Sequence, residues 1–204
     1  MTTHPLLQHS GVVYDYQLII RPPERVRARL DQVRQRLQEQ LLPFSQWVPG
    51  KNHVPVASFS QYAVLENKLT DRLQEIAAQV PPFVMQIENY GALLHHTVHF
   101  RLLESAGFSQ LLQYLRREQT ALQVMHQSAK LASLPKINVA YKLGPTDFEN
   151  TWHYFKSKKL HLHFVADGML LLRRRRASEK WQIIRRLGFE NQPALQQQGV
   201  LFAA

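Results

Sequence analysis

One short pattern occurs twice in this chain and constrains its fold more than any other feature. Each copy is an apolar, β-branched stretch that predicts a strand, and each follows a predicted helix and loop. The first copy is residues 52–59, Asn-His-Val-Pro-Val-Ala-Ser-Phe, and the second is residues 135–142, Pro-Lys-Ile-Asn-Val-Ala-Tyr-Lys. His53 and Lys136 lie 83 residues apart at the same place in the two copies. Because a helix and a strand hairpin follow each copy, the layout predicts an internal duplication.

The segments around the two copies predict alternating strands and helices. Apolar residues recur every three or four positions in four segments, as in amphipathic helices: 24–42, 65–80, 109–125 and 144–158. Strand patterns occupy most of the remaining core: 12–20, 83–90, 97–103, 160–165, 169–175 and 181–189. This arrangement indicates an α+β fold of antiparallel sheets backed by helices.

The charge and composition narrow the classes of function. The 204 residues include no cysteine and carry a formal net charge of +10. The lack of cysteine excludes disulfides, a thiol nucleophile and thiolate metal ligands. No apolar run approaches the ~18 residues of a membrane helix, and the N-terminus lacks a signal-peptide pattern, so a cytoplasmic protein without a membrane partner is expected. The positive charge favours a polyanionic partner such as RNA or a nucleotide, although it also suits a merely soluble surface.

The two copies resemble the paired His-x-Thr/Ser-x motifs of the two-histidine phosphoesterase superfamily, which includes 2′-5′ RNA ligase-like and cyclic phosphodiesterase proteins. The similarity covers about residues 12–189 and extends to flanking residues: Tyr14-Asp15-Tyr16, Pro82-Phe83, Trp152 and Trp181. The resemblance implies two lobes related by a pseudo-two-fold axis, with a motif strand from each lobe facing a central cleft. We therefore expect residues 1–204 to form one two-lobed domain, with peripheral segments at 1–11 and 190–204.

The resemblance also implies a chemistry, of which this chain keeps only part. In the superfamily, two imidazoles transfer protons during cleavage of a cyclic phosphodiester without a metal, and the hydroxyl residues bind the phosphate. Of the four signature positions only His53 is retained, because Pro55, Lys136 and Asn138 occupy the other three. Pro55 has no hydrogen-bond donor, whereas Asn138 can donate its amide N–H to phosphate. Lys136 can bind phosphate as a point charge, but a usual pKa of about 10.4 makes it a poor proton shuttle.

Strict alternation along the first motif strand predicts which of its side chains act together. It places His53, Pro55, Ala57 and Phe59 on one face and Ser58 on the other. Ser58 is therefore not expected to replace the missing hydroxyl.

The same alternation along the second strand places Lys136, Asn138, Ala140 and Lys142 on one face. Asn138 and Lys142 are then the expected phosphate ligands. His53 is the candidate catalytic base, and Lys136 the candidate acid or electrostatic stabiliser.

Several other groups offer alternatives. His95-His96-Thr97-Val98 spells the motif literally, but it lies in a predicted hairpin rather than at the motif position. His161 and His163 alternate as a metal pair would, yet no third ligand stands at a matching spacing, so no metal is expected. The C-terminal hairpin is basic and either contacts a nucleic acid or forms a solvated rim; its candidate residues are Arg173, Arg175 and Arg185. The arginines of the first helix are interpreted as a solvated face: Arg25, Arg27, Arg29, Arg34 and Arg36.

These observations favour a protein that binds RNA ends or nucleotide phosphate esters in a basic cleft, with weak or lost catalysis. The alternative is an active, metal-independent cyclic phosphodiesterase or RNA ligase-like enzyme that uses His53 and Lys136. Neither hypothesis requires a cofactor. A different small-molecule activity on the same fold is a third hypothesis, because a fold does not determine a function.

Overall fold

Strands and helices alternate through two halves of the chain. The computed structural model describes residues 11–40, 48–120, 122, 128–175, 177 and 179–191. The first half comprises β1 (Val13–Ile20), α1 (Glu24–Gln40), β2 (Val48–Pro49), β3 (Val54–Tyr62), the 3₁₀ turn η2 (Ala63–Leu65), α2 (Glu66–Ala78) and β4 (Phe83–Leu93). The second comprises β5 (Thr97–Leu102), α3 (Ala106–Arg117), β6 (Lys130–Leu131), β7 (Lys136–Tyr141), α4 (Pro145–Phe155), β8 (His161–Ala166), β9 (Gly168–Arg174) and β10 (Gln182–Gly188). The expected peripheral segments, except residues 11, 190 and 191, lie outside the described residues.

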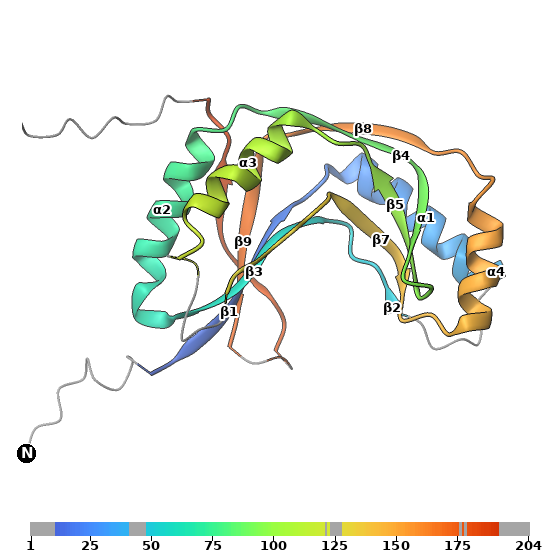
Figure 1. Ribbon diagram of the computed structural model, residues 1–204, viewed down its shortest axis with the longest axis horizontal. Helices are drawn as coiled ribbons and strands as arrows, with labels where there is room; N and C mark the ends of the chain where they lie inside the picture. Colours follow the sequence, from blue (N-terminus) through green and yellow to red (C-terminus); the bar gives the residue numbers. More distant parts are fainter. Residues whose placement is uncertain are drawn as a thin grey trace, which may run out of the picture.

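The strands form two antiparallel sheets, which together make an arch (Figure 1). One sheet has the order β10-β9-β1-β3-β6 and the other has the order β8-β4-β5-β7-β2. Helix α2 contacts β10, and α3 contacts β6 of the first sheet and β4 of the second, whereas α1 contacts β7 and β8 and α4 contacts β5. Each sheet therefore has one helix-covered face, and we call its other face the open face. The predicted α+β class, with antiparallel sheets backed by helices, is confirmed.

Apolar side chains at helical spacing explain how the helices cover the sheets. The buried side chains of α2 are Leu69, Thr70, Leu73, Ile76 and Ala77, and those of α3 are Phe108, Leu111, Leu112 and Leu115. Their burial contributes about 1.5–3 kcal/mol for each large apolar side chain. Helix α3 begins three residues before the expected position, and the N–H of Ser109 donates to the carbonyl of Ser105 within its first turn. Within the described residues, no helix is long and apolar enough to cross a membrane.

The buried stripe of α1 contains one residue that the sequence assigned to the solvated face. Val26, Leu30 and Leu37 are buried as expected, but the remaining buried position is Arg34, which is 6% exposed. The interpretation of all five arginines as solvated is therefore wrong for Arg34. The side chain is tolerated in the core because it finds hydrogen-bond partners there, which are described below.

The two sheets are joined by an exchange of short edge strands. The two-residue strand β2 precedes β3 in the chain but pairs with β7, and the two-residue strand β6 precedes β7 but pairs with β3. The N–H of Gly50 donates to the carbonyl of Val139 at 3.0 Å, and the N–H of Ala132 donates to the carbonyl of Val56 at 2.8 Å. This reciprocal crossing brings β3 and β7 together near the middle of the arch, as the duplication predicted.

Gly50 is required where the first crossing segment passes over β7. A Cβ atom at this position would overlap the main-chain carbonyl of Asn138. No rotamer change relieves such an overlap, because both groups belong to the backbone. The glycine therefore permits the close approach of the two motif strands.

We predict that Gly50→Ala lowers the free energy of unfolding by about 1–3 kcal/mol, the usual cost of overpacking. The matched control is Gly188→Ala in β10, where the nearest atom to a new Cβ would be 3.8 Å away. That variant should stay within about 0.5 kcal/mol of the parent. Urea unfolding of the three proteins measures both values, and equal stabilities would show that the crossing segment is not held as described.

Candidate functional site

Strand β3 contains an extra residue that changes the direction of its side chains. Its pairing with β1 passes from Leu18↔Ala57 to Ile19↔Pro55, so Val56 has no partner in the register. This two-against-one pairing is a β-bulge, and it interrupts the alternation of side chains between the two faces.

Strand β7 contains the same irregularity at the corresponding position. Its pairing with β5 passes from Val98↔Ala140 to His99↔Asn138, which leaves Val139 without a partner. The two bulges thus follow His53 and Lys136 at the same distance along the chain. The duplication therefore extends to the backbone geometry of the motifs.

The first bulge moves Ser58 onto the same face as Pro55. Pro55 lies opposite Ile19 and Ser58 lies opposite Gln17, and cross-strand partners share a face. Ile19 and Gln17 are two residues apart in a regular strand, so all four side chains point to the same side. Ser58 is exposed. The expectation that Ser58 points away from Pro55 is therefore wrong, because it assumed a strand without a bulge.

The second bulge places Tyr141 on the open face beside Lys136 and Asn138. Tyr141 pairs with Thr97, whereas Ala140 pairs with Val98 and is fully buried. The expectation that Ala140 shares a face with Lys136 is wrong for the same reason. Tyr141 and Ser58 occupy corresponding positions, so each lobe presents one hydroxyl on the open face after its bulge.

Lys142 follows β7 in a backbone conformation with φ of 59°. Its direction is therefore not given by alternation along the strand. The side chain is exposed, and among the described residues no carboxylate forms an ion pair with Lys142 or with Lys136. Within the part of the chain that the structure describes, the positive charge of each lysine therefore has no carboxylate partner.

His99 of β5 was not singled out by its sequence, yet it lies opposite Asn138 on the open face. Its Nδ1 atom is buried without a hydrogen-bond partner, and so is the Oδ1 atom of Asn138. Burial, together with the charge of Lys136, lowers the pKa of His99, which favours a neutral imidazole. Gly91 of β4 leaves room for the ring, because a Cβ there would lie 2.5 Å from Nε2 of His99.

Arg34 connects the two motifs through one buried guanidinium. Its Nη2 donates to the carbonyl of Asn138 at 2.7 Å, its Nε donates to the carbonyl of Val139 at 3.3 Å, and its Nη1 donates to Oδ1 of Asn52. The guanidinium also lies 5.4 Å from the ring centroid of Phe100. Burial lowers the pKa of Arg34, but five donors in a planar fork suit several acceptors at once. Asn52, the residue before His53, is thereby connected through Arg34 to the bulge of β7.

His53 lies in the bend that leads into β3, where its N–H donates to the carbonyl of Lys51 at 2.9 Å. The side chain is half-buried. Burial is the main cause that lowers its pKa to about 4, and the positive charges of Lys51, Arg34 and Arg21 act in the same direction. His53 is therefore neutral at physiological pH, which is the form that a proton acceptor requires.

The His95-His96 pair lies beside the end of β7, because the carbonyl of His96 accepts a hydrogen bond of 3.0 Å from the N–H of Leu143. His95 and His96 stand at the tip of the β4–β5 hairpin, where the His95 ring packs edge-on against Phe148. His96 Nδ1 forms a hydrogen bond of 2.8 Å with the hydroxyl of Thr97. Among the described residues, no group of three or more His, Cys, Asp or Glu side chains is placed to hold a metal ion.

The arginines of the C-terminal hairpin are partly engaged by carboxylates. Arg173 forms an ion pair with Glu66 at 2.8 Å and stacks over Tyr14, and Arg185 lies 3.8 Å from Asp71. Arg175 is exposed. Of these three candidates for nucleic-acid contact, Arg173 is the most fully occupied by partners within the protein.

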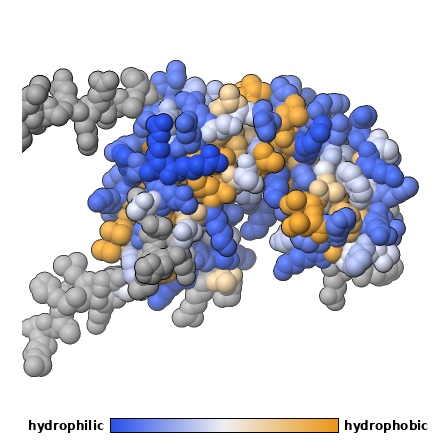
Figure 2. Space-filling view, in the orientation of Figure 1, coloured by the Kyte–Doolittle hydropathy of each residue, from blue (hydrophilic) through white to orange (hydrophobic). Residues whose placement is uncertain are grey.

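Figure 2 shows the surface hollowed between the two halves of the arch, below the strands that carry the motifs. Comparison with solved structures finds the same fold in other proteins. TT0787 of Thermus thermophilus superposes with a TM-score of 0.64 at 15% identity, over 88% of this chain and 100% of that chain. E. coli LigT in complex with 3′-AMP gives a TM-score of 0.65 at 14% identity, over 87% of this chain and 98% of that chain. At these identities the similarity concerns the fold alone.

Sequence comparisons give the family itself. A search of curated proteins found no match. The family model of the 2′-5′ RNA ligase superfamily matches residues 20–178, which include both motif strands and the helices between them. The resemblance noted from the motifs is thereby confirmed, and the chain belongs to the 2′-5′ RNA ligase superfamily.

Proposed function

We propose that this protein binds RNA ends or nucleotide phosphate esters at the paired motif strands, with weak or lost catalysis. The observation that carries the proposal is the row formed by Lys136, Asn138 and His99 on the open face of the β7 sheet. It places Lys136, which has no carboxylate partner among the described residues, beside the side-chain amide of Asn138 and the imidazole of His99. A cation and a neutral N–H donor on one face suit a phosphate ester, because hydrogen bonds and charge contacts to an ionised oxygen are stronger than neutral ones.

The ligand chemistry follows from these groups. A phosphate ester offers negative charge to Lys136 and acceptor oxygens to the amide of Asn138. The hydroxyls of Ser58 and Tyr141 stand at corresponding positions of the two lobes and supply further donors. E. coli LigT has been crystallised with 3′-AMP, with ATP and with phosphate, which supports a nucleotide ligand for the related chain. These groups bind a phosphate ester through charge and hydrogen bonds alone.

Weak or lost catalysis follows from two of the three departures in the motifs, Lys136 and Pro55. His53 is neutral and suits the role of base, but the second motif has a lysine, Lys136, where the family motif has an imidazole that transfers protons readily near neutral pH. Pro55 removes the phosphate donor of the first motif, and a donor aimed at developing charge is worth several kcal/mol in enzymes.

An active metal-independent cyclic phosphodiesterase or RNA ligase-like enzyme is the second candidate. One observation favours it: the imidazole of His99 stands beside Lys136, so a histidine lies close to the second motif. In this alternative His53 accepts a proton, and Lys136 donates one or stabilises the leaving oxygen.

The binding proposal predicts that Lys136→Ala weakens the binding of a short RNA with a 3′-phosphate about tenfold, or about 1.4 kcal/mol. The loss should shrink as salt rises, because the contact is electrostatic. Lys68→Ala, on the exposed side of α2, is the matched control and should bind like the parent. Isothermal titration with and without a chelator measures these affinities. Unchanged affinity in a Lys136→Ala/Lys142→Ala variant would move the RNA to the hairpin of Arg175 and Arg185.

The lowered pKa of His53 predicts a pH dependence of stability. Between its unfolded value of about 6.5 and its folded value of about 4, the unfolded chain binds a proton that the folded chain does not. The contribution of the neutral His53 is therefore complete above pH 6.5 and falls toward pH 4, by up to about 1.4 kcal/mol per pH unit. His53→Asn removes this slope. Urea unfolding of both proteins at pH 5, 6 and 7 tests it, and a pH-independent difference between them would contradict the buried neutral state.

The catalytic deficit predicts that hydrolysis of 2′,3′-cyclic nucleotides by the parent is slow or undetectable. The variant Pro55→Thr/Lys136→His restores both missing groups and should raise turnover by about 10²-fold or more. Each single change should give much less, because acid, base and phosphate donors act as a unit. Strong turnover by the parent that disappears in His53→Ala would instead establish the enzyme hypothesis.

A further inference from the structure

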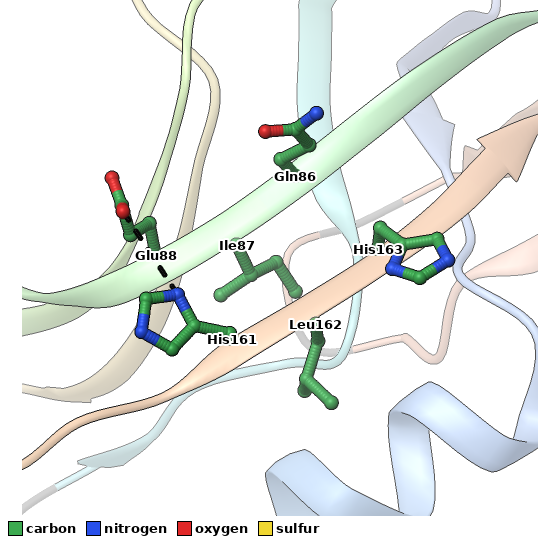
Figure 3. Close-up of a pocket in the computed structure, with 6 residues that line it drawn as sticks. All are labelled: Gln86, Ile87, Glu88, His161, Leu162 and His163. Atoms are coloured by element: carbon green, nitrogen blue, oxygen red, sulfur yellow. Dashed lines mark ion pairs between the residues drawn. The ribbon is translucent and has the colours of Figure 1, made fainter.

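We propose that the pocket between β4 and β8 binds a nucleobase of the RNA strand whose phosphate lies at β7. The pocket is lined by Gln86, Ile87, Glu88, His161, Leu162 and His163 and has a volume of about 290 Å³ (Figure 3). This size is close to the lower end of the ~300–1,000 Å³ range of small-molecule sites. The inference rests on the proposed function, and it adds a base-binding pocket to the phosphate contacts proposed above.

The polar side chains of the pocket stand on the open face of the sheet. Glu88 lies opposite His161, and Gln86 lies opposite His163, so each pair shares a face. Ile87 lies between them in sequence and is 1% exposed, which assigns it to the helix-covered face. Figure 3 shows Gln86 and Glu88 on the other side of β4 from Ile87.

A row of polar side chains on the open face joins this pocket to the motif of β7. Lys136 lies opposite Arg101 of β5. Arg101 donates from Nε to the carbonyl of Glu88 and from Nη2 to its Oε2, both at 3.2 Å. Glu88 Oε1 lies 3.9 Å from Nδ1 of His161. The row spans three strand spacings, or about 14 Å, a length that a short piece of RNA covers with a phosphate at one end and a base at the other.

The spacing of the two imidazoles suits a flat ring. His161 and His163 are two residues apart on one face of a strand, so their Cβ atoms are separated by about 6.4–6.8 Å. This is about twice the 3.4 Å rise between stacked bases, which leaves room for one base between the two rings. Single-stranded RNA is commonly recognised by stacking on aromatic rings, including histidine.

The remaining side chains of this surface match the other parts of a base. The amide of Gln86 offers both a donor and an acceptor to the edge of the base. Beyond it, the cross-strand pair Val84 and Val165 is 49% and 58% exposed, an apolar extension of the same open face. No metal-binding group of three ligands includes the two histidines within the described residues.

The test uses an RNA trinucleotide with a 3′-phosphate and three versions of it that carry an abasic residue at each position in turn. His161→Ala/His163→Ala should weaken the parent trinucleotide about 5- to 100-fold, the usual contribution of stacking one base. One of the abasic trinucleotides should bind the parent protein as weakly as the unmodified trinucleotide binds the double-alanine variant. The double-alanine variant should bind this abasic trinucleotide with the same affinity as the parent protein does. His153→Ala removes an exposed histidine from α4 and is the matched control.

Aromatic and cationic replacements separate stacking from charge. His161→Phe/His163→Phe should keep most of the affinity, whereas His161→Lys/His163→Lys should not. If only the lysine variant retains the affinity for the trinucleotide, the two histidines contact a phosphate instead of a base, and the base site is overturned. If Lys136→Ala weakens binding while every variant at 161 and 163 behaves like the parent, the base site is wrong and the proposed function stands. If no phosphate ester binds the parent at all, the proposed function fails and the base site fails with it.

Discussion

The arrangement of the two motifs depends on the buried guanidinium of Arg34. It bonds to Asn52 on one side and to the carbonyls of Asn138 and Val139 on the other, so that one side chain from α1 sets the position of both motif strands. A buried charge is costly unless several hydrogen bonds compensate it. The compensation here comes from the carbonyls of Asn138 and Val139, from Oδ1 of Asn52 and from the carboxylate of Asp31, which lies 3.2 Å from Nη1. The candidate site is therefore built on an interaction between segments far apart in the chain.

The paired bulges explain how a degenerate motif keeps a polar surface. Without them, Ser58 would point away from Pro55, and Ala140 rather than Tyr141 would stand beside Asn138. Each bulge shifts the following residues by one place and presents a hydroxyl on the open face. In the proposed function, these hydroxyls serve as phosphate donors in place of the threonines or serines of the family motifs. Proton transfer is less easily replaced, because it requires a group whose pKa lies near the working pH.

The same open face continues from the motif strand to the edge of the sheet. Lys136, Arg101, Glu88 and His161 follow one another across four neighbouring strands. In the proposed function, this surface combines an anion site at one end with planar rings at the other. That combination suits a nucleotide chain better than an isolated phosphate, because phosphate contacts position a strand whereas base contacts select it.

The sequence by itself determined the periodic elements, the duplication and the family. These depend on the spacing of residues along the chain and on short contiguous motifs such as the one that contains His53. It also identified the replacement of a histidine by Lys136. The burial of Arg34, the direction of Ser58 and the place of His99 beside the second motif were decided only by the tertiary structure. A helix pattern does not reveal which arginine will find acceptors in the core. A strand pattern does not reveal an extra residue whose effect exists only against its partner strand, because register is a property of two segments and not of one.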